Sequence, residues 1–92
     1  MLQPSYTKQF SKDLKKIERS GNKDIEKIKT VIRELINERQ LNPFHRDHAL
    51  KGSFKDRREC HIEPDWLLIY KINKNDKTII FERTGSHSEL FR

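Results

Sequence analysis

The segment from Trp66 to Tyr70 constrains the fold more than any other, because it is the most apolar run in the chain. Its apolar side chains alternate to both sides of an extended backbone, the pattern of a strand that is packed on both faces. Pro64, just before this segment, cannot donate to a strand ladder and therefore ends the preceding run. We expect a central strand that the chain enters through a tight turn.

Further strands are expected beside this central one. Residues 57–62 alternate with the period of a strand before the turn. Thr78 to Thr84 returns after a polar turn at residues 73–77, which predicts a hairpin. Leu2 to Tyr6 is expected to be a short first strand, at the edge of the sheet because it contains Pro4. The sequence thus predicts a mainly antiparallel sheet of about four strands.

Helical spacing of apolar residues replaces this alternation in the first part of the chain. Thr7 is a suitable N-cap for a helix over residues 8–20, and Gly21 supplies the left-handed residue that ends it. We expect Asn22 to cap a second helix that runs to about Arg39. The connection is so short that the two helices should form an antiparallel hairpin.

The remaining segments complete the predicted architecture. Residues 44–55 have no clean periodicity and are expected to be a structured loop. Near the C-terminus, Ser86 and Glu89 have the spacing of a capping box and predict a short helix with His87 in its first turn. A strand, two helices and a run of strands, in that order, indicate one two-layered α+β domain over residues 1–92.

The charge balance indicates a polyanionic partner. Lys and Arg number 20 against 14 Asp and Glu, which gives a net charge of +6; nucleic acid suits this excess, and so does a simple basic surface. The single cysteine excludes an internal disulfide and a cysteine zinc cluster, and favours a reducing cytoplasm. No apolar run approaches the roughly 20 residues of a membrane span, and no signal-peptide pattern is visible, so we expect no membrane partner.

Three of the four histidines, His48, His61 and His87, come from different segments, and a sheet can bring them together with Asp65. Imidazole titrates near neutral pH and can give or take a proton. Metal-free RNA cleavage needs a base for the 2′-OH, an acid for the 5′-oxygen and cations for the phosphate. The set therefore predicts acid–base cleavage of RNA, although each histidine alone is also compatible with an ordinary surface position.

Cations and aromatic rings would hold the substrate of such a site. Arg58, Arg83 and Lys51 are candidates for binding the phosphate. Trp66 and Phe91 are candidates for stacking on unpaired bases. For Trp66 the alternative is a position in the hydrophobic core.

A metal site is the rival interpretation of the same side chains. Three histidines and Asp65 are acceptable zinc ligands. No two of them have a compact spacing such as His-x-x-x-His, so this interpretation has little support. We expect neither a metal nor another cofactor.

The sequence leaves open whether His87 acts as base or acid. At a helix start the dipole disfavours imidazolium, and Arg83 would add to this effect if it faced the same cleft. A bound phosphate would favour the charged ring, which suits an acid.

Longer motifs surround these residues. They are Phe10-Ser11-Lys12-Asp13-Leu14-Lys15-Lys16, Asp47-His48-Ala49-Leu50-Lys51-Gly52, Arg58-Glu59-Cys60-His61-Ile62-Glu63-Pro64-Asp65-Trp66, Arg83-Thr84-Gly85-Ser86-His87 and Leu90-Phe91. Through them the chain resembles, over essentially its whole length, the YafQ-like branch of the RelE/ParE superfamily, toxins of bacterial type II toxin–antitoxin pairs. Phe54 stands where tryptophan is common in that family, Arg57 where an aromatic residue is frequent, and His45 is additional.

This resemblance implies a helical hairpin packed against the sheet. It also implies metal-independent, ribosome-dependent cleavage of mRNA, neutralisation by a cognate antitoxin, and contact with operator DNA only through the toxin–antitoxin complex. The catalytic positions of the family fall on His48, His61, Asp65 and His87, with Trp66 and Phe91 in the site. Two alternatives stay open: a non-catalytic toxin of the same superfamily that binds a partner, and a ribosome-associated RNA-binding protein.

Overall fold

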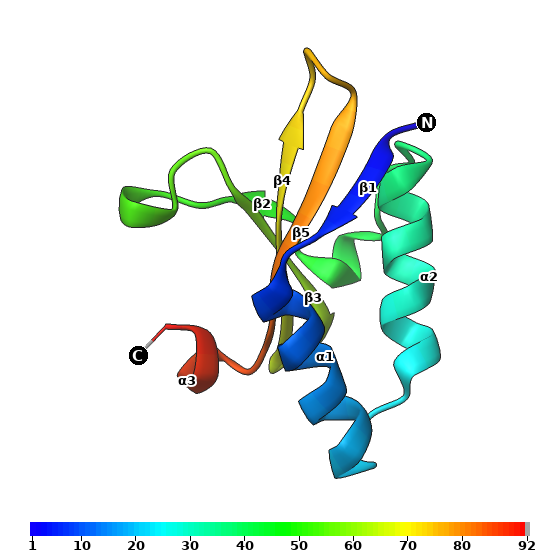
Figure 1. Cartoon of the computed structure of the whole chain (residues 1–92), viewed down its shortest axis with the longest axis vertical. Helices are drawn as coiled ribbons and strands as arrows, with labels where there is room; N and C mark the ends of the chain where they lie inside the picture. The colour runs from blue at the N-terminus through cyan, green and yellow to red at the C-terminus, as the bar shows by residue number, and fades with distance from the viewer. Residues whose placement is uncertain (92) are drawn as a thin grey trace.

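The computed structural model describes residues 1–91. Within these residues the chain forms five strands, three α-helices and two short 3-10 helices (Figure 1). The strands are β1 (Gln3–Tyr6), β2 (His48–Ala49), β3 (Arg58–Glu63), β4 (Trp66–Asn73) and β5 (Thr78–Gly85). The helices are α1 (Lys8–Ser20), α2 (Ile25–Ile36) and α3 (His87–Leu90), with the 3-10 helices η1 (Pro43–His45) and η2 (Gly52–Phe54). The predicted α+β class is confirmed.

The strands form one sheet in the order β1-β5-β4-β3-β2, with β4 at its centre as predicted. β1 runs parallel to β5, and the other neighbours are antiparallel. Within residues 1–91 the sheet has five strands rather than about four, because β2 lies in the segment predicted to be a loop. Only His48 and Ala49 pair in β2, and so short a strand shows no alternation in the sequence.

The ends of α1 follow the prediction. The Thr7 side chain accepts a hydrogen bond from the main-chain N–H of Phe10. Gly21 ends the helix with a left-handed φ of 68°, a conformation that glycine adopts without steric cost. The chain then reverses, and α2 runs in the opposite direction to α1 (Figure 1).

The ends of α2 differ from the prediction. Asn22 is not its cap: the side chain of Asp24 accepts from the Glu26 N–H, and the helix ends at Ile36 instead of near Arg39. Asn and Asp are about equally good caps, so spacing alone did not choose between them. Within residues 1–91, no helix combines the length and apolar character that a membrane crossing requires.

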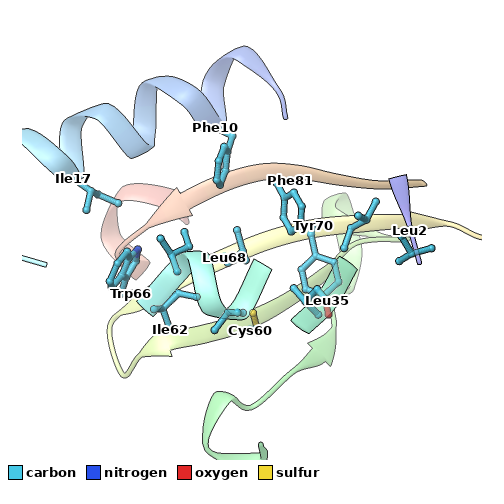
Figure 2. Packing of buried hydrophobic residues seen from close by; sticks show 13 residues of the cluster. Leu2, Phe10, Ile17, Leu35, Cys60, Ile62, Trp66, Leu68, Tyr70 and Phe81 are labelled. Atoms are coloured by element: carbon cyan, nitrogen blue, oxygen red, sulfur yellow. The ribbon is translucent and has the colours of Figure 1, made fainter. Parts of the chain in front are cut away.

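The main hydrophobic core lies on the face of the sheet that α1 and α2 cover (Figures 1 and 2). Its buried members are Leu2, Phe10, Ile17, Ile28, Val31, Leu35, Cys60, Ile62, Trp66, Leu68, Tyr70, Ile79 and Phe81. The Trp66 indole N–H donates to Thr84 Oγ1 at 3.0 Å, so its polar group is satisfied inside this core.

The other face of the sheet carries a smaller apolar cluster. Leu67 and Ile69 of β4 pack there against α3, with the chain around η2 beside them. Apolar packing on both faces of β4 agrees with the prediction of a central strand. In the register of the sheet these two residues stand directly opposite His61 and Glu59 of β3, so the polar pair lies on this second face.

Candidate active site

Three imidazoles meet on the face of the sheet that α1 and α2 leave uncovered. His48 comes from β2, His61 from β3 and His87 from the start of α3. The ring centroids of His48 and His61 are 6.5 Å apart, and those of His61 and His87 are 5.7 Å apart. With Arg46 and Phe91 they line an open cavity of about 680 Å³. The structure thus brings together the three histidines that the sequence singled out.

Asp65 holds His87 in place with one carboxylate oxygen. Its Oδ1 accepts the main-chain N–H of His87 at 3.0 Å and the ring Nδ1–H at 2.9 Å. These hydrogen bonds hold the pKa of Asp65 below its usual range, so the carboxylate is ionised at neutral pH. Because Nδ1 donates, the neutral ring of His87 carries its lone pair on Nε2.

The predicted capping box fixes the helix start that carries His87. Ser86 Oγ accepts the Glu89 N–H at 3.3 Å, and the Glu89 carboxylate accepts the Ser86 N–H at 2.9 Å. Lys16 of α1 adds an ion pair to Glu89 at 3.0 Å. The Ser86 N–H, and then Lys16, lower the pKa of Glu89 to about 2. The position of α3 is therefore tied both to its own cap and to α1.

Glu59 belongs to this cluster, although the sequence reasoning missed it. Its side chain is buried, and Oε1 lies 3.2 Å from His61 Nε2. His61 Nδ1 lies 3.2 Å from the carbonyl oxygen of Pro64. Both ring nitrogens of His61 thus face an oxygen atom of the chain, and these two contacts hold the ring in place. A signal was present, because Glu59 and His61 are two residues apart in a strand and must share a face.

His48 is more exposed than His61. Its Nδ1 donates to the carbonyl oxygen of Arg46 at 2.7 Å, and its Nε2 lies 3.9 Å from Glu59 Oε1. The neutral ring therefore also carries its lone pair on Nε2. Arg46 has a left-handed φ of 49° and lines the cavity. It is a cation of the site that no feature of the sequence distinguished.

Two predicted phosphate ligands lie elsewhere. Arg58 donates to Asp47 at 3.0 Å on the helix-covered side of the sheet, because strand alternation places it on the opposite face from His61. Arg83 donates to Asp13 of α1 at 2.8 and 3.3 Å, and this contact raises its pKa. Neither arginine lines this cavity, and the prediction that they bind the substrate phosphate stays a prediction.

The two predicted stacking residues, Trp66 and Phe91, differ in their exposure to solvent. Trp66 is fully buried beneath the helices, so the prediction that it stacks on a base is wrong for this structure. Phe91 is 36% exposed, with its ring centroid 6.4 Å from that of His87 and 5.2 Å from that of Phe54. Part of its surface is available to a base. Lys51 is exposed at the residue before η2 and stays a candidate cation.

Part of this cluster also fits a metal ion. One ligand atom each of Glu59, His61 and His87 lies within 4.8 Å of the others. Imidazole nitrogens and a carboxylate oxygen suit zinc or copper, and Asp65 on Nδ1 of His87 is the kind of partner that orients such a ligand. No sequence spacing indicated this group, because β3 and α3 meet only in the folded chain.

Fold and cluster together define a class of protein: small basic α+β domains that carry proton-transfer side chains on the open face of a sheet. A family model described as the bacterial toxin of a type II toxin–antitoxin system, YafQ, matches residues 2–92. The chain belongs to this toxin family. The resemblance drawn from its motifs is thereby confirmed.

Named relatives and solved structures agree with this membership. The mRNA interferase toxin YafQ of Escherichia coli is 46% identical over 87 residues, which are 94% of this chain and 91% of the relative. The structure of the E. coli DinJ–YafQ complex matches with a TM-score of 0.87 at 43% identity and covers 100% of both chains. A metal-bound toxin from Helicobacter pylori matches with a TM-score of 0.89 at 46% identity, over 99% of this chain and 100% of the other.

Proposed function

We propose that the chain is an endoribonuclease that cleaves mRNA on the ribosome and so inhibits translation, as the toxin of a type II pair. The name of the E. coli relative, an mRNA interferase, supports this activity at 46% identity. The convergence of His48, His61, His87 and Asp65 around one open cavity carries the proposal. We place the activity in the single domain of residues 1–92 and in the cytoplasm, where ribosomes are.

The proposed reaction moves two protons. The 2′-oxygen attacks the neighbouring phosphorus while the bond to the 5′-oxygen breaks, so one proton leaves the 2′-OH and one reaches the leaving oxygen. His48 and His87 suit these transfers, because each ring is oriented through Nδ1 and presents Nε2. A protonated His61, held beside Glu59, would place positive charge where the phosphate becomes more negative in the transition state.

Other residues around the cavity suit the binding of RNA. The exposed part of the Phe91 ring offers a surface on which an unpaired base can stack. Arg46 in the wall offers charge to phosphates, and Lys51, which follows the cavity residue Leu50 in the chain, is a second candidate. The cavity is open rather than enclosed, so we infer that the ribosome supplies the remaining constraint on the mRNA.

The proposed partners follow from charge and from the relatives. A net charge of +6 suits ribosomal and messenger RNA. The E. coli relative was solved in complex with DinJ, which supports a cognate antitoxin here, acidic where it covers this domain. Operator DNA would be bound only by the complex of the two proteins.

Mapping of mRNA cuts tests this function. The protein is induced in cells, and 5′-ends of mRNA are mapped on messages that are translated and on matched messages without a start codon. We expect new cuts only on the translated messages, and none with His87→Ala. Equal cutting of untranslated RNA would overturn ribosome dependence, and an absence of cuts in toxic cells would favour a binding toxin.

A second candidate function is metal binding by the same cluster. The proximity of Glu59, His61 and His87 favours it, and the H. pylori relative was solved with a metal. A bound ion would occupy the Nε2 lone pair of His87 that proton transfer requires, so we expect added zinc or copper to raise the melting temperature and to inhibit cleavage. Chelator-treated protein should cleave at the untreated rate on ribosomes kept in magnesium, and a need for zinc would contradict the proposed reaction.

A further inference from the structure

A polar network lies on the helix-covered side of the sheet, away from the histidine cavity. The Asp47 carboxylate accepts the hydroxyl hydrogen of Tyr70 and, at 3.0 Å, a hydrogen bond from Arg58. Arg58 of β3 and Tyr70 of β4 are partners in the sheet register, so this carboxylate bridges two adjacent strands. Tyr70 belongs to the buried core, and burial raises its pKa. Its hydroxyl is therefore a permanent donor to Asp47.

The network is joined directly to a residue of the cavity. Asp47 precedes His48, and β2 contains only His48 and Ala49, which pair with Glu59 and Arg58. Neighbouring side chains of a strand point to opposite faces. The Asp47 side chain thus reaches the core side, while His48 reaches the cavity.

Few other contacts fix the position of His48. Its ring is exposed, and its short hydrogen bond goes to the carbonyl of Arg46, in the same loop. That hydrogen bond orients the ring relative to the loop, but it does not fix the loop relative to the sheet. A strand of two residues supplies little pairing of its own. The contacts of Asp47 join this loop to β3 and β4 directly beside His48, whereas the next link, from the Leu50 N–H to the Arg57 carbonyl at 2.9 Å, lies beyond β2.

We propose that Asp47, Tyr70 and Arg58 are positioning residues that hold β2 in register and so place the His48 ring beside Glu59. They touch no substrate. The inference rests on the proposed proton-transfer role of His48. It gives Arg58 a role on the face of the sheet opposite to the one on which a phosphate would bind.

Tyr70→Phe is the sharpest variant, because it keeps the ring in the core and removes only the hydroxyl. We expect single-turnover cleavage of ribosome-bound mRNA to slow by about 10–100-fold, the scale of a misplacement of roughly 1 Å. Asp47→Asn, which keeps the shape of the side chain, should also slow cleavage. Tyr6→Phe is the matched control: the other tyrosine packs on Phe10 and Phe81, and its loss of a hydroxyl should leave the rate unchanged.

A double-mutant cycle separates positioning from a general loss of stability. If Tyr70 acts through His48, Tyr70→Phe slows the wild type but adds no further loss to His48→Ala. Losses that add in full would overturn the proposal, because Tyr70 would then act independently of His48.

Nuclear magnetic resonance of the free protein gives a second readout that does not depend on activity. In Tyr70→Phe we expect the His48 ring signals to shift and the Ala49 amide to exchange faster, while amides of β4 stay protected. Unchanged His48 signals and exchange would overturn the positioning role. If the His48 signals shift but cleavage keeps the wild-type rate, Tyr70 does position His48, and the proposed role of His48 in catalysis is overturned.

Discussion

Each imidazole of the cavity is oriented by oxygen atoms that the chain itself supplies. A main-chain carbonyl fixes His48, a carboxylate fixes His87, and one of each flanks His61. These contacts differ in charge, so three chemically identical rings are held by different groups and present different ring atoms to the cavity. At the scale of the residue, the oxygen atoms around a histidine matter as much as the histidine itself.

The exposed ring of Phe91 leads to a prediction about substrate binding. If one base stacks on this ring, Phe91→Ala should weaken binding by about 1–3 kcal/mol. Steady-state cleavage on ribosomes should show this as a higher KM with a nearly unchanged kcat, because stacking is alike in ground and transition states.

Trp66→Phe is the control for Phe91→Ala. It removes a buried hydrogen bond to Thr84, so it should lower the melting temperature and leave KM unchanged. An unchanged KM in Phe91→Ala, or a raised KM in Trp66→Phe, would contradict the assignment of these two aromatic residues.

Residue types at the site were largely predictable from the sequence, but the faces to which they point were less so. The histidines and Asp65 stood out because few side chains transfer protons near neutral pH. Arg58 and Trp66, which were candidates for contact with the substrate, lie on the helix-covered face. Alternation of residues 58–62 already placed Arg58 with Cys60 rather than with His61. Charge alone was therefore a weaker guide than strand register.

At the scale of the element, α3 carries His87 and depends on Glu89. The pKa of Glu89 falls from an ordinary 4.5 to about 2 in the folded protein. A depressed pKa contributes stability that is present above the unfolded value and is lost as pH falls through the folded value. This contribution is therefore complete above about pH 5 and is lost between about pH 4.5 and pH 2.

Glu89→Gln tests that contribution. The variant should be less stable than the wild type at neutral pH, and the difference should vanish as the pH approaches 2. Urea unfolding at a series of pH values measures it. Glu38→Gln is the control. It removes an exposed ion pair with the amino group of Met1 and should have little effect. A Glu89→Gln deficit that persists undiminished at low pH would contradict the account.

Elements with long periodic patterns were predictable, and short ones were not. α1, β4 and β5 lie where their spacing placed them. β2 has no pattern of its own: its two residues pair with the edge of β3, and Asp47 before them contacts Arg58 and Tyr70. Asp24 rather than Asn22 caps α2, a choice between near-equal residues that tertiary packing settles.

For the whole molecule, the main hydrophobic core and the histidine cavity lie on opposite faces of the sheet. α1 and α2 cover one face of the sheet (Figure 1), where the main core lies, and the imidazole cavity lies on the other face together with α3. The two-layered architecture could be predicted from the order of elements. The convergence of His61 with His87 was also expected, but the contacts that produce it, such as Lys16 with Glu89, could not be specified because they join residues distant in sequence.

The net charge leads to a prediction about the antitoxin. If an acidic antitoxin neutralises the excess of Lys and Arg, the affinity of the complex should fall steadily as salt is raised. Isothermal titration of the two proteins over a range of sodium chloride concentrations measures this. An affinity that does not change over that range would show that apolar contacts, not charge, hold the antitoxin.

The central claim is that side chains of this cavity move the protons of RNA cleavage. It is tested most directly by single-turnover cleavage of ribosome-bound mRNA by the wild type and by His87→Ala, with ribosome binding measured in parallel. The account predicts a loss of roughly 10²–10⁴-fold in cleavage rate with ribosome affinity nearly unchanged. A folded His87→Ala protein that binds the ribosome and cleaves at close to the wild-type rate would contradict it.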